Sequence, residues 1–188
     1  MSFPIPEHES ERLARLRDTG LLDSAPEVAF DRLTDLAAHL FEVPTALVSL
    51  VDSDRQWFKA RTGCDLTETS RDVAFCAHAV AARELLVVPD AASDPRFADN
   101  PLVIGPPGIR FYAGAPLITE DGHALGTLCL IDVVPRQIGE RETYTLTALA
   151  ATAMELIEAR QALQRERALT TRLSMELGGF SRGAPVRA

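Results

Sequence analysis

Cysteine, lysine and long apolar segments are all scarce in this 188-residue chain. The three cysteines, Cys64, Cys76 and Cys129, cannot all pair and none lies in a CxxC motif, which fits free thiols in a reducing compartment. Lys59 is the only lysine, a bias that we attribute to genome composition. No apolar run approaches the ~20 residues that span a bilayer, and the N-terminus lacks the basic and apolar regions of a secretory signal. These absences predict a cytoplasmic protein that does not enter a membrane.

Positive charge is also in short supply. The formal net charge is −8 at pH 7, which disfavours nucleic-acid binding because phosphate neutralisation needs clustered lysine and arginine. The remaining composition, 46% hydrophobic and 24% charged, is that of a soluble globular protein, and the length is sufficient for one domain with its own core. We therefore expect one acidic, soluble domain that binds neither nucleic acid nor membranes.

The common phosphate-binding and hydrolase motifs are missing as well. The chain contains no GxxxxGK[ST], GxGxxG or GxSxG sequence. Its four histidines, His8, His39, His78 and His123, fall in four separate predicted elements and none forms an HxxxH or HExxH pair. The sequence therefore predicts no metal site and no catalytic residue.

Hydrophobic periodicity predicts an α+β domain. The helical segments span residues 6–19, 26–42, 70–82 and 140–177, with a helical turn over 94–100. The strand-like segments span residues 46–51, 56–61, 85–88, 110–119 and 123–132. The last two strands flank Glu120-Asp121-Gly122, and Asp-Gly between apolar runs is a strong hairpin signal. Because the recognisable connections are hairpins, we expect an antiparallel sheet.

Two of these helices carry further expectations. Ser24 is a candidate N-cap for the helix over 26–42, whose apolar residues at helical spacing are Val28, Phe30, Leu33, Leu36, Ala37 and Leu40. The closing helix shows the 3-4 spacing of a coiled coil at Leu146, Leu149, Ala153 and Leu156. The tail over 178–188 is Gly-rich and polar, and we expect it to be disordered.

Cys76 and His78 are the most conspicuous candidates for chemistry. Residues i and i+2 of a helix lie about 200° apart, so these two side chains should point away from each other rather than form a catalytic or metal-binding pair. Cys76 shares its face with Val73 and Val80, which indicates a buried core thiol or a thiol that lines an internal cavity. Cys129 is expected in the core of a strand, and Cys64 should be the most exposed thiol.

The large aromatic residues gather in the middle of the chain. They are Trp57, Phe58, Phe97, Phe111 and Tyr112. Core packing would account for most of them, but some could form the wall of a small-molecule cavity between the sheet and the helices.

Seven segments in consecutive order resemble a known family. They are residues 46–52 (ALVSLVD), 54–60 (DRQWFKA), 75–78 (FCAH), 87–91 (VVPDA), 94–97 (DPRF), 111–117 (FYAGAPL) and 125–132 (LGTLCLID). They are similar to segments of GAF domains, most of all those at the N-termini of bacterial sensor kinases and cyclic-di-GMP enzymes. The resemblance covers about residues 12–162.

This resemblance implies a central twisted antiparallel sheet flanked by helices, with long N- and C-terminal helices that pack together and against a second subunit. It divides the chain into an N-terminal helix and linker (1–22), a GAF-like domain (23–165), and a helix end with a tail (166–188). A ligand pocket is expected between the sheet and the segments 70–82 and 94–103. The pocket candidates are Trp57, Phe75, Cys76, Phe97, Phe111 and Tyr112.

Three specialised GAF functions can be compared with this chain. Bilin carriers attach the pigment to a cysteine followed by histidine, but their cysteine lies later in the chain and their Asp-Ile-Pro segment has no counterpart here. Cyclic-nucleotide sites carry an Asn-Lys-x-x-x-Phe-x-x-x-Asp-Glu signature that is also missing. Free methionine sulfoxide reductases have cysteines near the positions of Cys64 and Cys76, but a further catalytic cysteine has no match within residues 101–109.

The sequence thus favours a noncatalytic sensory or regulatory module. It would bind a small ligand, with its cofactor if any unknown, form a homodimer through its terminal helices, and act on an output protein such as a kinase or cyclase. One alternative is a thiol-dependent small-molecule reductase centred on Cys76, with Cys64 as the resolving thiol. Another is a ligand-free dimerisation scaffold whose pocket is filled by Phe75, Phe97 and Phe111.

Overall fold

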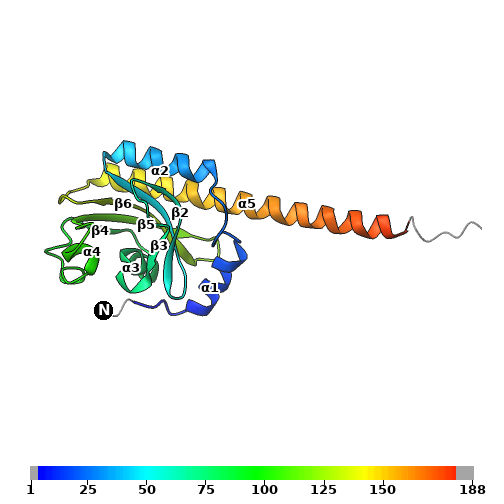
Figure 1. The fold of residues 1–188 in the computed structure, drawn as a ribbon, viewed down its shortest axis with the longest axis horizontal. Helices are drawn as coiled ribbons and strands as arrows, with labels where there is room; N and C mark the ends of the chain where they lie inside the picture. Colours follow the sequence, from blue (N-terminus) through cyan, green and yellow to red (C-terminus); the bar gives the residue numbers. More distant parts are fainter. Residues whose placement is uncertain (1–3, 181–188) are drawn as a thin grey trace, which may run out of the picture.

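A six-stranded antiparallel sheet forms the middle layer of the molecule (Figure 1). The structure is a computed structural model that describes the backbone of residues 4–180 and the side chains of residues 4–175. The strands lie in the order β3-β2-β1-β6-β5-β4. Their bounds are β1 Thr45–Val51, β2 Arg55–Thr62, β3 Glu68–Ser70, β4 Leu86–Val88, β5 Phe111–Ile118 and β6 Ala124–Asp132. The expected α+β fold with a central antiparallel sheet is therefore confirmed.

Helices cover both faces of this sheet. On one face α2 (Val28–Phe41) and α5 (Glu140–Phe180) lie side by side (Figure 1). The other face carries α3 (Phe75–Ala82), a short 3-10 helix η1 (Arg71–Val73) and α4 (Pro101–Ile104). The first helix, α1 (Glu9–Asp18), contacts β6 and has ten residues, whereas α5 has 41.

The two faces of the sheet enclose two separate hydrophobic cores. Since successive side chains of a strand point to opposite faces, β1 sends Val48 and Leu50 towards α2 and α5, and Leu47 and Val51 towards α3. The same alternation divides the side chains of β5 and β6. Which face a strand residue occupies therefore decides whether it can reach the α3 side, where the candidate site lies.

The segment over 70–82 is not one helix, and this expectation was wrong. Ser70 ends β3, and its hydroxyl accepts a hydrogen bond from the Asp72 amide at the start of η1. Ala74 then has an extended backbone, so that α3 begins only at Phe75. The expected helical turn over 94–100 is present, because the Asp94 carbonyl accepts from the Phe97 and Ala98 amides and its carboxylate accepts from the Arg96 amide. The Asn100 side chain caps α4 by accepting from the Leu102 amide.

The expected start and buried face of α2 also need correction. Ser24 does not cap the helix, because its hydroxyl is hydrogen-bonded to the Lys59 ammonium. Only half of the expected apolar residues are buried, namely Phe30, Leu33 and Ala37. Val28, Leu36 and Leu40 are exposed, because they lie on the side of the helix that faces away from the sheet.

The apolar residues at 3-4 spacing in α5 pack against the core of the domain. Leu146 and Ala153 are buried in the core beneath α5, and Leu149 and Leu156 pack against the same core. Beyond residue 161 the described side chains are exposed, and α5 projects away from the sheet (Figure 1). The helix continues past its expected end at residue 177, while residues 181–188 of the predicted tail lie outside the described part of the chain. No helix within residues 4–180 combines the length and hydropathy that a membrane span requires.

Candidate functional site

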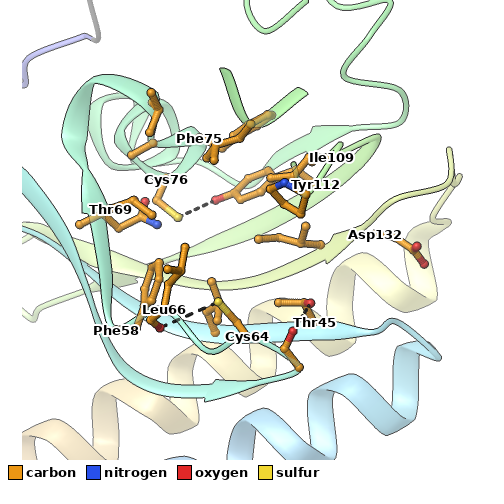
Figure 2. A pocket seen from close by; sticks show the side chains of 18 of the residues that line it. Thr45, Phe58, Cys64, Leu66, Thr69, Phe75, Cys76, Ile109, Tyr112 and Asp132 are labelled. Carbon is orange, nitrogen blue, oxygen red and sulfur yellow. Dashed lines mark hydrogen bonds between the residues drawn. The ribbon is translucent and has the colours of Figure 1, made fainter. Parts of the chain in front are cut away.

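A cavity of about 410 Å³ lies between the sheet and the helical segments on the α3 side (Figure 2). Its floor comes from Leu47, Phe58 and Ile131 on β1, β2 and β6, and its roof includes Phe75 and Cys76 of α3. The volume falls in the range of small-molecule sites. Exposed residues in its wall show where it reaches the surface; they are Pro44, Gly63, Asp65, Leu66, Pro106, Pro107 and Val133.

The cavity wall is mainly apolar and contains one strip of polar groups. Gln56 of β2 and Thr69 of β3 are direct cross-strand partners, so their side chains stand next to each other on one face of the sheet. The Gln56 Oε1 and Thr69 Oγ1 atoms are both buried, and neither has a hydrogen-bond partner among the described residues. Buried polar groups are normally satisfied, so this strip indicates a position for a partner that the chain itself does not supply.

The charged groups of the wall are few and negative. None of the described lining residues is an arginine, lysine or histidine. Asp65 is exposed, and the Asp132 carboxylate is occupied by the Arg136 guanidinium at 2.6 Å and by the Val133 amide at 2.6 Å. The cavity therefore offers no cation to an anionic ligand.

Cys76 lies in a buried cluster at the inner end of the cavity. Its sulfur accepts hydrogen bonds from Thr127 Oγ1 at 3.0 Å and from Tyr112 Oη at 3.2 Å, the second of which is visible in Figure 2. The Cys129 sulfur is 3.8 Å away. Burial raises the pKa of Cys76, but hydrogen bonds from Cys129, Thr127 and Tyr112 outweigh it and bring that pKa to about 7.

An aromatic stack supports this part of the wall. The Phe75 ring packs against Phe97 with centroids 4.1 Å apart on one side and against Tyr112 at 5.2 Å on the other. Tyr112 is 1% exposed. The stack fixes the Tyr112 ring over the sheet and so aims its hydroxyl at Cys76.

The structure divides the six predicted pocket residues into two groups. Phe75, Cys76 and Tyr112 line the cavity. Trp57 and Phe111 do not, because strand alternation turns them into the core beneath α2 and α5, and Phe97 stands behind Phe75. Whether the lining residues bind a ligand stays a prediction.

Sequence reasoning missed the polar strip and much of the floor. The alternation of side chains along β2 could have identified two of these residues. If Trp57 faces the core beneath α2, its neighbours Gln56 and Phe58 lie on the opposite face of the sheet. Thr69 had no signal, because β3 was not expected. Cys64 was considered only for its thiol; it is half-buried and lines the cavity, with its sulfur 3.9 Å from the Leu66 carbonyl oxygen.

Cys76 and His78 lie in different surroundings, as predicted. Cys76 is buried, whereas His78 is half-buried with its ring edge-on to Phe97 at 4.8 Å. Burial and the nearby Arg96 charge lower the pKa of His78. Among the described residues, no group of three or more His, Cys, Asp or Glu side chains could hold a metal ion.

The fold and the cavity define a class of protein, and comparison with known proteins identifies it. The family model of the GAF domain matches residues 25–157, so the chain belongs to the GAF domain family. A cyclic di-GMP phosphodiesterase of Pseudomonas aeruginosa is 44% identical over 155 residues, which are 82% of this chain and 26% of that protein. The chain therefore spans about a quarter of the length of this curated relative.

Solved structures agree on the fold. The GAF domain of an Acinetobacter phosphoenolpyruvate-protein phosphotransferase has a TM-score of 0.62 at 17% identity, with 84% of this chain and 97% of that chain covered. A free methionine-R-sulfoxide reductase from Neisseria meningitidis, solved with its substrate, has a TM-score of 0.57 at 21% identity, with 84% and 90% covered. At such identities the likeness concerns the fold alone.

Proposed function

We propose that the chain is a noncatalytic sensory module of the cytoplasm that binds a small molecule in the cavity on the α3 side. The observation that carries this proposal is the polar strip of Gln56 and Thr69, two buried and unpartnered groups on the wall of an otherwise apolar cavity. An unpaired buried polar group costs about 1–3 kcal/mol, so a ligand that satisfies it gains a corresponding advantage.

The chemistry of the wall favours a neutral ligand with hydrogen-bond donors. The Gln56 Oε1 atom is an acceptor and needs a donor, and the Thr69 hydroxyl can pair with either kind of group. Because no cation lines the cavity, a ligand with phosphate or carboxylate groups buried there would lack a counter-charge. This argues against cyclic nucleotides and acidic pigments as occupants.

A chain of contacts leads from the cavity to the base of the projecting part of α5. Phe58 lines the cavity, and the next residue, Lys59, extends under α2, where its ammonium lies 2.7 Å from the Glu27 carboxylate. Glu27 also contacts Arg160 of α5 at 2.8 Å. A shift of β2 on ligand binding would reach α5 through these ion pairs, and the ligand would act through its different affinity for the two positions.

The output is proposed to pass through α5 as part of a homodimer. Leu163, Leu169 and Leu173 are exposed on the part of α5 that projects from the domain. A second copy of α5 would bury these side chains, and an output protein such as a kinase or cyclase would respond to a change in their packing.

Native mass spectrometry of the protein as purified, repeated after denaturation, tests ligand binding and dimerisation together. We expect a dimer with a mass excess that denaturation removes, and we expect Gln56→Leu to lose the excess while the exposed Gln137→Leu control keeps it. An empty cavity, both as purified and after incubation with a low-molecular-mass cell extract, would support the ligand-free scaffold instead. A monomer would contradict the proposed output.

A reductase is the second candidate because Cys64 and Cys76 line the same cavity. In that function a disulfide between these two thiols would form during turnover of a substrate such as methionine sulfoxide. Turnover that is lost in Cys76→Ser would support it, and a protein without turnover and without this disulfide would remove it.

A further inference from the structure

Cys76 and Cys129 form a pair of neighbouring thiols that ligand binding does not explain. Cys76 lies on α3 and Cys129 on β6, and their sulfurs are 3.8 Å apart in the buried cluster at the inner end of the cavity. Neither cysteine forms a disulfide bond. The pair spans the contact between a helix and the sheet, so a bond between them would join two elements of the fold.

The surroundings give the two thiols different roles. Cys76 is the second residue of α3, and the N-cap of this helix makes no side-chain hydrogen bond. The Cys76 sulfur also accepts hydrogen bonds from the Thr127 and Tyr112 hydroxyls. A helix N-terminus and hydrogen-bond donors both stabilise a thiolate. The titratable groups of the described chain that face Cys76 are Cys129 on β6 and Tyr112 on β5. The Cys76 hydrogen bond and burial raise the pKa of Cys129, so the first proton leaves the pair from Cys76.

Cys76 can be reached by a small molecule even though it is 1% exposed. Its side chain lines the cavity, whose wall also includes surface-exposed residues such as Leu66 and Pro107. Cys129 does not line the cavity. A reagent that enters would therefore meet Cys76 first and have Cys129 directly behind it.

We propose that Cys76 is a peroxide-oxidisable thiol and that Cys129 is its resolving thiol, with a small hydroperoxide admitted through the cavity as the oxidant. The Cys76 thiolate attacks one peroxide oxygen, the O–O bond breaks, and the other oxygen takes a proton and leaves as water or an alcohol. Cys76 is then a sulfenic acid. Cys129 gives up its proton and attacks the Cys76 sulfur, the S–O bond breaks, and the oxygen leaves as water. Two electrons pass from the two thiols to the peroxide, and one disulfide forms.

The disulfide would alter the wall of the cavity. A bonded pair of sulfurs is about 2 Å apart, so the Cys76 and Cys129 side chains must move together from their present 3.8 Å by rotation, by a shift of α3 against β6, or by both. The Cys76 sulfur would also cease to be a thiolate acceptor for the Tyr112 hydroxyl, and Tyr112 lines the cavity. Oxidation would thus change the site that the proposed function assigns to a ligand, although the thiol pair itself does not depend on that function.

The test uses the Cys64→Ser variant of the full chain, which keeps the proposed pair and removes the third thiol. The variant is treated with stoichiometric hydrogen peroxide and then denatured in the presence of N-ethylmaleimide, which alkylates any free thiol. The product is analysed by intact mass and peptide mapping. We expect the loss of two hydrogens, no maleimide on either cysteine, and a linked Cys76–Cys129 peptide that dithiothreitol reverses. The rate should fall as the pH drops below 7, because the Cys76 thiolate is then protonated.

A double variant and the wild-type protein complete the test. In Cys64→Ser with Cys129→Ser, dimedone should trap a sulfenic acid on Cys76. In the wild type, the Cys76–Cys129 disulfide should form in preference to one with Cys64. Maleimide on both cysteines of the Cys64→Ser variant, at peroxide concentrations that oxidise free cysteine, would overturn the proposal. So would a Cys64–Cys76 disulfide in the wild type, which would favour the reductase.

Discussion

Tyr112 lies across Gly114 so closely that a Cβ atom at Gly114 would come within 2.1 Å of the phenol oxygen and 2.6 Å of the ring carbon that bears it. The ring passes over this glycine towards Cys76, and Phe75 covers its other side. Gly114 therefore permits the position of the hydroxyl in the cysteine cluster. Its role is a close approach of a side chain, since the structure gives this glycine no left-handed backbone.

Gly114→Ala should destabilise the protein by about 2–3 kcal/mol, because the new methyl group overlaps a ring that is itself packed and cannot move without strain. Chemical denaturation measures this as a loss in the free energy of unfolding. In a Tyr112→Leu background the same change should cost less than ~1 kcal/mol, since the overlapping ring is gone. An equal cost in both backgrounds would show that the glycine matters for another reason.

Glu9 should make the protein sensitive to acid. Its carboxylate contacts the buried guanidinium groups of Arg12 and Arg71. Burial raises the pKa of Glu9, but the hydrogen bonds and charges of the two arginines outweigh this and hold it below the ordinary 4.5. Ionised Glu9 thus favours the folded state above that pH, and this stability is lost as the pH falls through the folded pKa.

The Glu9→Gln variant measures this contribution. At pH 7 it should be less stable by roughly 2–4 kcal/mol, because two buried arginines lose their shared carboxylate. The difference from the wild type should shrink as the pH falls below 4.5 towards the lowered pKa of folded Glu9, because the unfolded chain takes up the proton first. The exposed Glu7→Gln is the matched control and should behave like the wild type throughout. A Glu9→Gln penalty that stays constant from pH 7 to pH 3 would refute the argument.

The main strands and their antiparallel arrangement could be predicted from the sequence because apolar runs and hairpin turns are local signals, whereas the pairing of β1 with β6 had no local signal. The site could be predicted only in part. Phe75, Cys76 and Tyr112 line the cavity, but choosing between Trp57 and Phe58 requires knowing which face of β2 is covered by α2. Aromatic character favours both faces equally, so composition does not decide.

The burial of Lys59 could not be predicted, because it depends on an irregular stretch of backbone. A bulge interrupts the β1–β2 pairing, which aligns Ser49 with Phe58 but Val48 with Ala60, so Lys59 is the extra residue. Its side chain enters the core beneath α2, where the ammonium binds Ser24 and Glu27. The sequence shows one lysine without indicating that it is buried, because the bulge and the linker that covers it arise only in the folded chain.

Gln56 should lower the free energy of unfolding of the ligand-free protein. Gln56→Met retains the length of the side chain and removes a buried acceptor without a partner, so the ligand-free variant should be more stable than the wild type by about 1 kcal/mol. Thr69→Val should act in the same direction, since it removes the other unpartnered group of the polar strip. Thermal and chemical denaturation of ligand-free protein provide the comparison. A lower stability for both variants would mean that these groups are already satisfied.

The projecting part of α5 should determine the oligomeric state. Leu169 and Leu173 are one turn apart and exposed, so replacing both with glutamate should cost the domain little of its own stability. In a dimer that packs on this face, the two charges would be buried without partners, and light scattering should find a monomer. Thr171→Glu adds a charge on the opposite side of the helix and should leave the dimer intact. If Thr171→Glu dissociates the dimer and the double leucine variant does not, the subunits meet through the other face of α5.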